Sequence, residues 1–119
     1  MIDTLGNQRR RMAILMLNTQ EEIHLKELSE WMAAIENDCS RHEVTGTMRR
    51  RIYISFIQHH ADALDNARLA VYHERDKVLE ATALTRDVRK PLVMLMEMEE
   101  SHILDEIVEQ TLINRIKPF

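Results

Sequence analysis

The stretch that decides the fold is RRRIYISFIQHHADALDNARLAVYHERDKVLEAT, from Arg49 to Thr82. It opens with three consecutive arginines, and its apolar side chains at steps of three and four predict a helix over residues 47–64. Two segments that favour β-structure follow, residues 69–73 and 78–82, and they flank a charged turn at 74–77. We therefore expect a helix that leads into a β-hairpin.

The residues before this stretch are predicted to form two helices, a short strand and a loop. Apolar spacing predicts a first helix over residues 5–17 and a second over residues 26–35, with a brief strand at 22–25 between them. The polar residues 37–47 are the best loop candidate. Helix, strand, helix, loop, helix and hairpin is the order of a winged helix-turn-helix domain. The predicted fold is thus mainly α with a small β-hairpin.

In this architecture the opening arginines have a physical rationale, because the third helix enters the major groove of DNA and the hairpin touches the adjacent backbone. An arginine in the first turn can neutralise a phosphate or bind a guanine edge in bidentate fashion. The helix N-terminus adds its own partial positive charge. The predicted DNA-binding residues are Arg49, Arg50, Arg51, Ser55, Gln58 and His59 on the helix, and Arg75 and Lys77 on the hairpin.

The same arginines have a second interpretation as a solvated helix face. Candidate ion-pair partners upstream are Glu21, Glu22 and Glu27. In the hairpin turn, Glu74 and Asp76 dilute the positive charge. The distribution of charge nevertheless favours DNA contact by the helix, because residues 46–61 hold three arginines and no acid in a chain of net charge -4.

A long C-terminal helix is predicted after Pro91, which suits a first helical turn, and nothing breaks it before about Arg115. Its apolar side chains form a broad double stripe, and residues 92–113 carry six acids and no Lys or Arg. Such a helix is expected to pack on its own domain and on a second copy of the chain. The expected dimer contacts are Leu92, Leu95, Met96, Ile103, Ile107 and Leu112. We divide the chain into a winged-helix domain, 1–83, and a dimerisation element, 84–119.

Composition narrows the class of protein. A chain of 119 residues with 45% hydrophobic content forms one domain with an appended element. The single cysteine, Cys39, precludes an internal disulfide and fits a reducing cytoplasm. No apolar run approaches the ~20 residues of a membrane span. We expect a soluble cytoplasmic protein that does not associate with membranes.

Catalytic and metal-dependent functions find little support in the motifs. The sequence has no Gly-rich phosphate loop, nucleophile elbow or H-E-x-x-H motif, so we expect no enzyme and no cofactor. Cys39 and His42 show C-x-x-H spacing, with His59 and His60 one helix away, but zinc needs three or four well-placed ligands. We expect Cys39 to be half-buried outside any metal site, and His60 to face the core and bond a backbone carbonyl.

Three blocks of the chain resemble a known family: WMAAIEND at 31–38, EVT at 43–45 and RIYISF at 51–56, together with His60 and Leu64. They resemble a domain-of-unknown-function family that is abundant in haloarchaea and their viruses. The resemblance covers about residues 7 to 82, and the tyrosine-containing block is its most specific part. It implies an archaeal or archaeal-virus source, a winged-helix fold and a role in transcription regulation.

Two departures from the family pattern affect the path of the chain. Ala61 and Asp62 replace a Leu-Pro pair, and Arg68 replaces the glycine that usually ends this helix. The resemblance therefore implies that the turn into the hairpin differs in detail.

The sequence predicts a transcription regulator that binds double-stranded DNA sequence-specifically as a homodimer. The alternative is a protein-interaction module that uses the acidic helix 92–113 as its binding surface. Salt dependence separates the two, because phosphate contacts release counterions and protein contacts mostly do not. A redox-responsive or metal-responsive switch at Cys39 and His42 is a third possibility.

Overall fold

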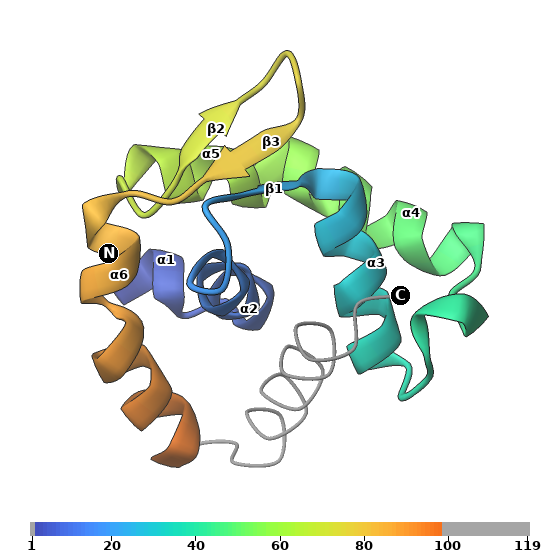
Figure 1. Ribbon diagram of the computed structural model, residues 1–119, viewed down its shortest axis with the longest axis horizontal. Coiled ribbons are helices and arrows are strands. Elements are labelled where there is room, and N and C mark those ends of the chain that lie inside the picture. The colour runs from blue at the N-terminus through green and yellow to red at the C-terminus, as the bar shows by residue number, and fades with distance from the viewer. Residues whose placement is uncertain (1, 99–119) are drawn as a thin grey trace.

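The computed structural model describes residues 2–98 of the 119-residue chain, which form a mainly helical fold with one small antiparallel sheet (Figure 1). The elements in chain order are α1 (Ile2–Leu5), α2 (Gln8–Leu17), β1 (Glu22–His24), α3 (Leu25–Glu36), the 3-10 turn η1 (Arg41–Glu43), α4 (Gly46–Ser55), the π-helical segment η2 (Phe56–His60), α5 (Ala61–Asn66), β2 (Val71–His73), β3 (Val78–Glu80) and α6 (Ala83–Asp87). This order confirms the predicted fold class and is compatible with a winged helix-turn-helix arrangement. Within residues 2–98, no helix has the length and apolar character needed to cross a bilayer.

The sheet joins the hairpin to the strand that precedes α3. Its order is β1-β3-β2, both pairs are antiparallel, and Leu79 stands opposite both Ile23 and Tyr72. Ile23 and Leu79 are buried, whereas Glu22 and His24, which flank Ile23, are exposed. This alternation turns one face of the short sheet toward the core. The predicted hairpin and the predicted strand at 22–25 are therefore both present, and they form a single sheet.

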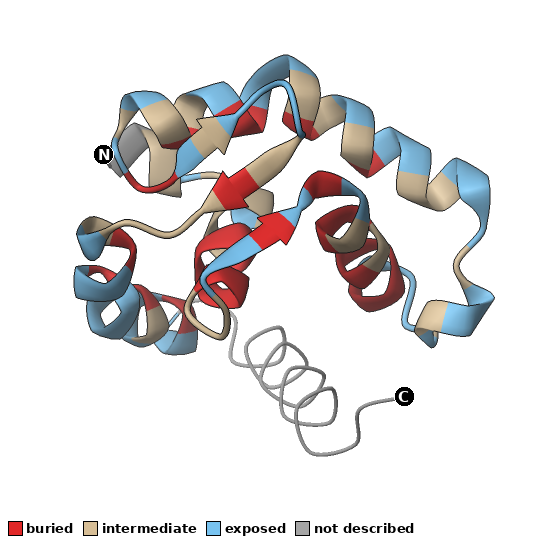
Figure 2. Ribbon diagram, turned by 45° about the horizontal axis from the view of Figure 1, so that its top comes forward, coloured by how far each residue is buried: buried red, intermediate tan, exposed pale blue. Residues whose placement is uncertain are grey.

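The core is built around α2, where six consecutive residues, 12–17, are buried. A helix that is apolar on all sides must be surrounded, and α2 lies in the middle of the molecule (Figure 1). Figure 2 shows the buried positions concentrated on α2 and on α3, with the inner residues of the sheet beside them. The sequence predicted one apolar stripe here, but the observed helix has no solvated side between residues 12 and 17.

The first predicted helix, 5–17, begins later than expected, at Gln8, and the short helix α1 precedes it. The chain breaks after α1 at Gly6, and Asn7 begins α2 as its N-cap, with Oδ1 accepting from the Arg10 amide at 3.2 Å. Such a cap satisfies one of the amides that a helix start leaves without an intrahelical partner. The three arginines at 9–11 consequently lie in the first turns of α2, at the edge of the core.

The predicted third helix, 47–64, is longer and less regular than expected, because α4, η2 and α5 run on continuously from Gly46 to Asn66. Within η2 the Ala61 amide donates to the Phe56 carbonyl, a wider turn than the α-helical one. The wider turn brings His60 and Ala61 to the core side together with Phe56 and Leu64. The segment 49–66 thereby supplies both a packed inner face and an exposed outer face.

After the sheet the chain enters α6, capped by Thr82, whose Oγ1 accepts from the Thr85 amide at 3.2 Å. The backbone is helical again over residues 89–98, so Pro91 lies in a first turn as predicted. Val88, Leu92 and Met96 are buried in the core of the same chain. The remainder of the predicted C-terminal helix, with Ile103, Ile107 and Leu112, lies outside the described residues.

Candidate nucleic-acid interface

The N-terminus of α4 has a side-chain cap and is accessible to a ligand. Thr45 Oγ1 accepts from the Met48 amide at 3.2 Å and thereby caps the helix. Gly46 follows, and a Cβ placed there would meet nothing within 4 Å. A ligand can therefore approach the backbone at this end of the helix, where the helix dipole favours an anion.

The exposed side chains of the helix 46–66 form one continuous stripe. Its members are Thr47, Arg50, Arg51, Ile54, Gln58, His59 and Asp62, and Arg49 lies half-buried beside it. Within residues 2–98, none of the three arginine side chains at 49–51 makes a hydrogen bond or an ion pair. The suggested pairing with Glu21, Glu22 or Glu27 is therefore not observed, and the three guanidinium groups are available to a ligand.

An open groove of about 980 Å³ runs between this stripe and the start of α3. Its lining residues are His24, Lys26, Gly46, Thr47, Arg49, Arg50, Arg51, Tyr53 and Ile54. Four of these side chains are cations and none is an acid. The groove is thus a positively charged surface on a chain whose net charge is -4.

Lys26 and His24 belong to this groove but were not predicted as site residues. His24 caps α3, with its Nδ1 accepting from the Lys26 amide at 3.0 Å, and both side chains are exposed. The sequence signal for them is weak on its own, because they stand more than 20 residues before Arg49. Only the packing of α3 against α4, expected for a helix-turn-helix, brings the two starts together.

The hairpin turn reaches the same region through a backbone contact. The Lys77 carbonyl accepts from the Leu25 amide at 2.8 Å, which fixes the end of the turn beside the start of α3. Arg75 is exposed and Lys77 is half-buried. The backbone of Lys77 therefore lies beside the start of α3, but neither hairpin cation lines the groove, and Glu74 and Asp76 are exposed in the same turn.

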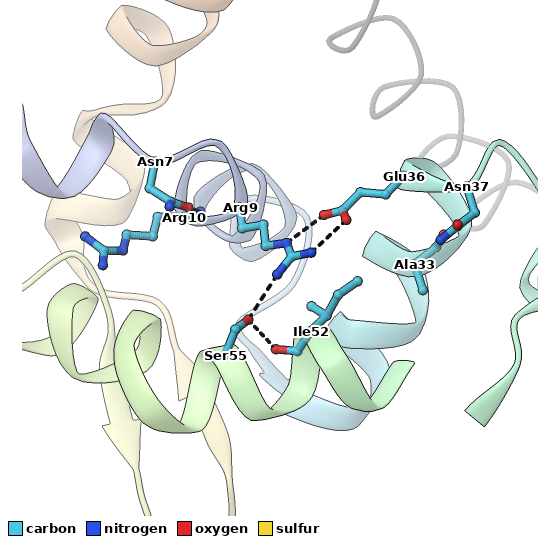
Figure 3. Close-up of polar contacts among 8 residues, drawn as sticks. All are labelled: Asn7, Arg9, Arg10, Ala33, Glu36, Asn37, Ile52 and Ser55. Carbon is cyan, nitrogen blue, oxygen red and sulfur yellow. Dashed lines mark hydrogen bonds and ion pairs between the residues drawn. The ribbon is translucent and has the colours of Figure 1, made fainter. Parts of the chain in front are cut away.

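Ser55 does not belong to the exposed stripe, so this part of the predicted DNA surface is corrected. Its hydroxyl donates to the Ile52 carbonyl at 2.7 Å and accepts from Arg9 Nη1 at 3.3 Å (Figure 3). Arg9 also holds Glu36 with two bonds of 2.8 and 2.9 Å, an interaction that raises the pKa of Arg9. Ser55 thus helps to join α4 to α2 and α3.

His60 faces the core as predicted, but its partner is a side chain. Arg10 Nε donates to His60 Nδ1 at 3.0 Å, and the imidazole meets the Phe56 ring edge-on at 4.9 Å. Burial, followed by the charges of Arg10, Arg9 and His59, lowers the pKa of His60 to about 4. His60 is a neutral acceptor that connects η2 to α2, whereas His59 next to it is exposed.

The loop before α4 shows no metal centre in the described part of the chain. Cys39 is half-buried, as predicted. Among residues 2–98, no three His, Cys, Asp or Glu side chains lie close enough together to hold a metal ion. The metal-responsive alternative at Cys39 and His42 therefore gains no support from the geometry.

The expected dimer contacts divide into two groups. Leu92 and Met96 are each 2% exposed, so they pack inside the chain itself. Leu95 is 38% exposed, and two methionines that were not among the predicted contacts, Met94 and Met98, are 63% and 85% exposed. The solvent side of helix 89–98 is therefore apolar at Met94, Leu95 and Met98.

Comparison with known proteins assigns the chain to one family. No curated protein and no solved structure matches it. The model of a family described as Domain of unknown function (DUF7344) matches residues 2–80, from α1 to the end of β3. The match thus contains the groove and the hairpin and covers more than half of the chain. The expected resemblance to a family of unknown function is confirmed, and the chain belongs to the DUF7344 family.

Proposed function

We propose that this protein is a cytoplasmic, sequence-specific transcription regulator that binds double-stranded DNA through the groove between α4 and the start of α3. The observation that carries the proposal is the groove itself, which gathers Lys26 and the arginines at 49–51 without an acid. These cations have no ion-pair partner within residues 2–98, so a phosphate backbone meets them without breaking an existing pair.

The dimensions of α4 suit this role. Its 10 residues make a rod about 15 Å long, and the major groove of B-DNA, about 12 Å wide, admits a helix. In the proposed orientation the start of α4 points toward the phosphates, and the stripe from Arg50 to Gln58 faces the base edges. In the same orientation, Arg75 and Lys77 of the hairpin are proposed to contact the adjacent DNA backbone.

We further propose that the protein binds DNA as a homodimer through helix 89–98 and the residues that follow it. The apolar solvent side of that helix, at Met94, Leu95 and Met98, supports this proposal. The symmetric contact would then lie on α-helical residues that do not line the basic groove. Two copies of the groove related by a two-fold axis are suited to a palindromic site.

The proposal is tested by fluorescence anisotropy on duplexes that tile the region upstream of the protein's own gene, over a series of salt concentrations. We expect a preferred tile and a steep fall in affinity with salt, because each phosphate contact contributes about −0.9 to the slope of log K against log salt. Arg50→Ala is expected to weaken binding. If Arg50 contacts a phosphate, the substitution should also reduce that slope by about one unit. If Arg50 contacts a base, it should instead relax the preference at one base pair by ~1–3 kcal/mol.

Arg89→Ala is the matched control, because Arg89 is also exposed but lies on helix 89–98 and does not line the groove. It should bind like the unaltered protein. Weak binding with no salt dependence would contradict the proposal and would favour the alternative, a protein-interaction module that acts through the acidic segment 92–113.

A further inference from the structure

Ile54 occupies an unusual position in the basic groove. Among residues 46–66, all of which the structure describes, it is the one large hydrophobic side chain that is exposed, at 41%. A single exposed hydrophobic residue is ordinary on a protein surface. This one, however, lines the groove beside Arg50 and Arg51, in the middle of an otherwise polar stripe.

Helix geometry places Ile54 next to both arginines. It follows Arg50 by four residues and Arg51 by three, and side chains at these spacings are neighbours on a helix surface. Four residues correspond to a rise of about 6 Å, close to two base-pair steps of about 3.4 Å each. A ligand group that contacts Ile54 therefore lies within about two base pairs of a base that Arg50 contacts.

The chemistry of the major groove supplies one apolar partner for such a residue. Guanine presents two acceptors that suit arginine, whereas thymine presents a methyl group that suits an apolar side chain. The β-branched side chain of Ile54 is stiff in a helix, so little side-chain entropy is lost when it meets that methyl group. Its neighbours on the same stripe offer less apolar surface, since Thr47 has a single methyl group beside its hydroxyl and Gln58 ends in an amide.

We propose that Ile54 recognises the 5-methyl group of a thymine that lies within two base pairs of a guanine bound by Arg50 or Arg51. This inference rests on the proposed DNA-binding function and adds a base preference to it. Burying a group the size of a methyl changes affinity by about fourfold, so the contact selects one base without dominating the binding energy.

The test replaces each thymine of the preferred duplex, one at a time, by uracil, which lacks only the methyl group. For the unaltered protein we expect about a fourfold loss of affinity at one position. For Ile54→Ala we expect weaker binding overall and equal affinity for thymine and uracil at that position. Met94→Ala, which truncates an exposed apolar side chain outside the groove, should retain the uracil effect.

Circular dichroism and thermal unfolding of Ile54→Ala should show that the fold is intact, because Ile54 is exposed. Equal affinity of the unaltered protein for every thymine–uracil pair would overturn the inference and leave DNA binding standing. An Ile54→Ala variant that keeps the uracil effect would assign the methyl contact to another residue and would equally overturn it. Failure to bind any duplex would overturn the proposed function itself.

Discussion

His60 shows how one buried titratable side chain can make the fold sensitive to pH. Its Nδ1 accepts from Arg10, so the neutral ring carries its proton on Nε2. Protonation of Nδ1 would replace that acceptor by a donor and set an imidazolium against a guanidinium. The surrounding protein accordingly lowers the pKa of His60 to about 4 from its ordinary value of 6.5, chiefly by burial.

A histidine whose pKa is lower in the folded state than in the unfolded state binds its proton more weakly when folded. Its contribution to stability is therefore complete above pH 6.5 and is lost as the pH falls toward about 4. We predict that the free energy of unfolding, measured by urea titration, falls by ~1–2 kcal/mol between pH 7.5 and pH 5, with allowance for partial solvent screening. In His60→Asn, which keeps an acceptor near Arg10 but does not titrate, this loss should be much smaller.

His59→Asn is the control for this experiment, because the His59 side chain is exposed beside His60 and has no hydrogen-bond or ring partner within residues 2–98. It should keep most of the dependence of stability on pH, because burial, the largest cause of the lowered pKa of His60, is unchanged and only the smaller effect of the His59 charge is removed. An unchanged pH dependence in His60→Asn would show that another group is responsible.

At the scale of the element, the backbone at the end of α5 is strained at Arg68, and a substitution there can relieve the strain. The Leu69 amide donates to the Leu64 carbonyl and the Arg68 amide to the Asp65 carbonyl, both at 2.9 Å, which is a Schellman motif. The motif requires a left-handed residue, and Arg68 has φ of 61°. Arg68 therefore adopts the backbone conformation that glycine adopts most readily.

We predict that Arg68→Gly stabilises the fold by ~0.5–1 kcal/mol, because a left-handed non-glycine residue costs ~1–2 kcal/mol and the greater freedom of glycine in the unfolded chain offsets part of that gain. Thermal unfolding should show a higher midpoint. Asp38→Gly at the end of α3 is the matched comparison, since Asp38 has φ of 50° but aspartate tolerates this region better. Its gain should be smaller. A loss of stability in Arg68→Gly would mean that the arginine side chain stabilises the turn.

The elements themselves were largely predictable, because spacing, caps and turn residues act over a few positions. The strand at 22–24, the helix start at Thr45 and the hairpin all follow from such local signals. The π-helical segment was not predictable, since it depends on how Phe56 and His60 fit against α2. The wrong placement of Ser55 has the same origin, because its face of the helix is decided by Arg9 on another element.

At the scale of the whole molecule, only part of the candidate site could be predicted from the sequence. The arginines at 49–51 could be found because they are consecutive and have no acid nearby in the sequence. Lys26 could not be found in that way, since it joins them only when α3 packs against α4. The same limit applies to helix 89–98. Its broad apolar stripe predicted packing both on its own domain and on a second copy of the chain, but it did not show which residues face the chain's own core.

The structure separates these two roles and makes the proposed dimer testable. Leu92 is 2% exposed and Leu95 is 38% exposed on the same helix. A charge at Leu92 therefore disrupts the core, whereas a charge at Leu95 disrupts only a contact with a second copy of the chain. We predict that the unaltered protein has the mass of a dimer by light scattering and that Leu95→Glu has the mass of a monomer with its helical content retained. Leu92→Glu should instead lose its cooperative unfolding transition.

Val71→Glu is the matched control, because Val71 on β2 is 39% exposed and lies away from helix 89–98. It introduces the same charge at the same exposure and should remain dimeric. If the dimer also stabilises the fold, the unfolding midpoint of the unaltered protein rises with protein concentration, by mass action, and that of Leu95→Glu does not. A Leu95→Glu variant that stays dimeric would place the symmetric contact elsewhere on the molecule. That other contact would then have to account for any spacing of half-sites measured on DNA.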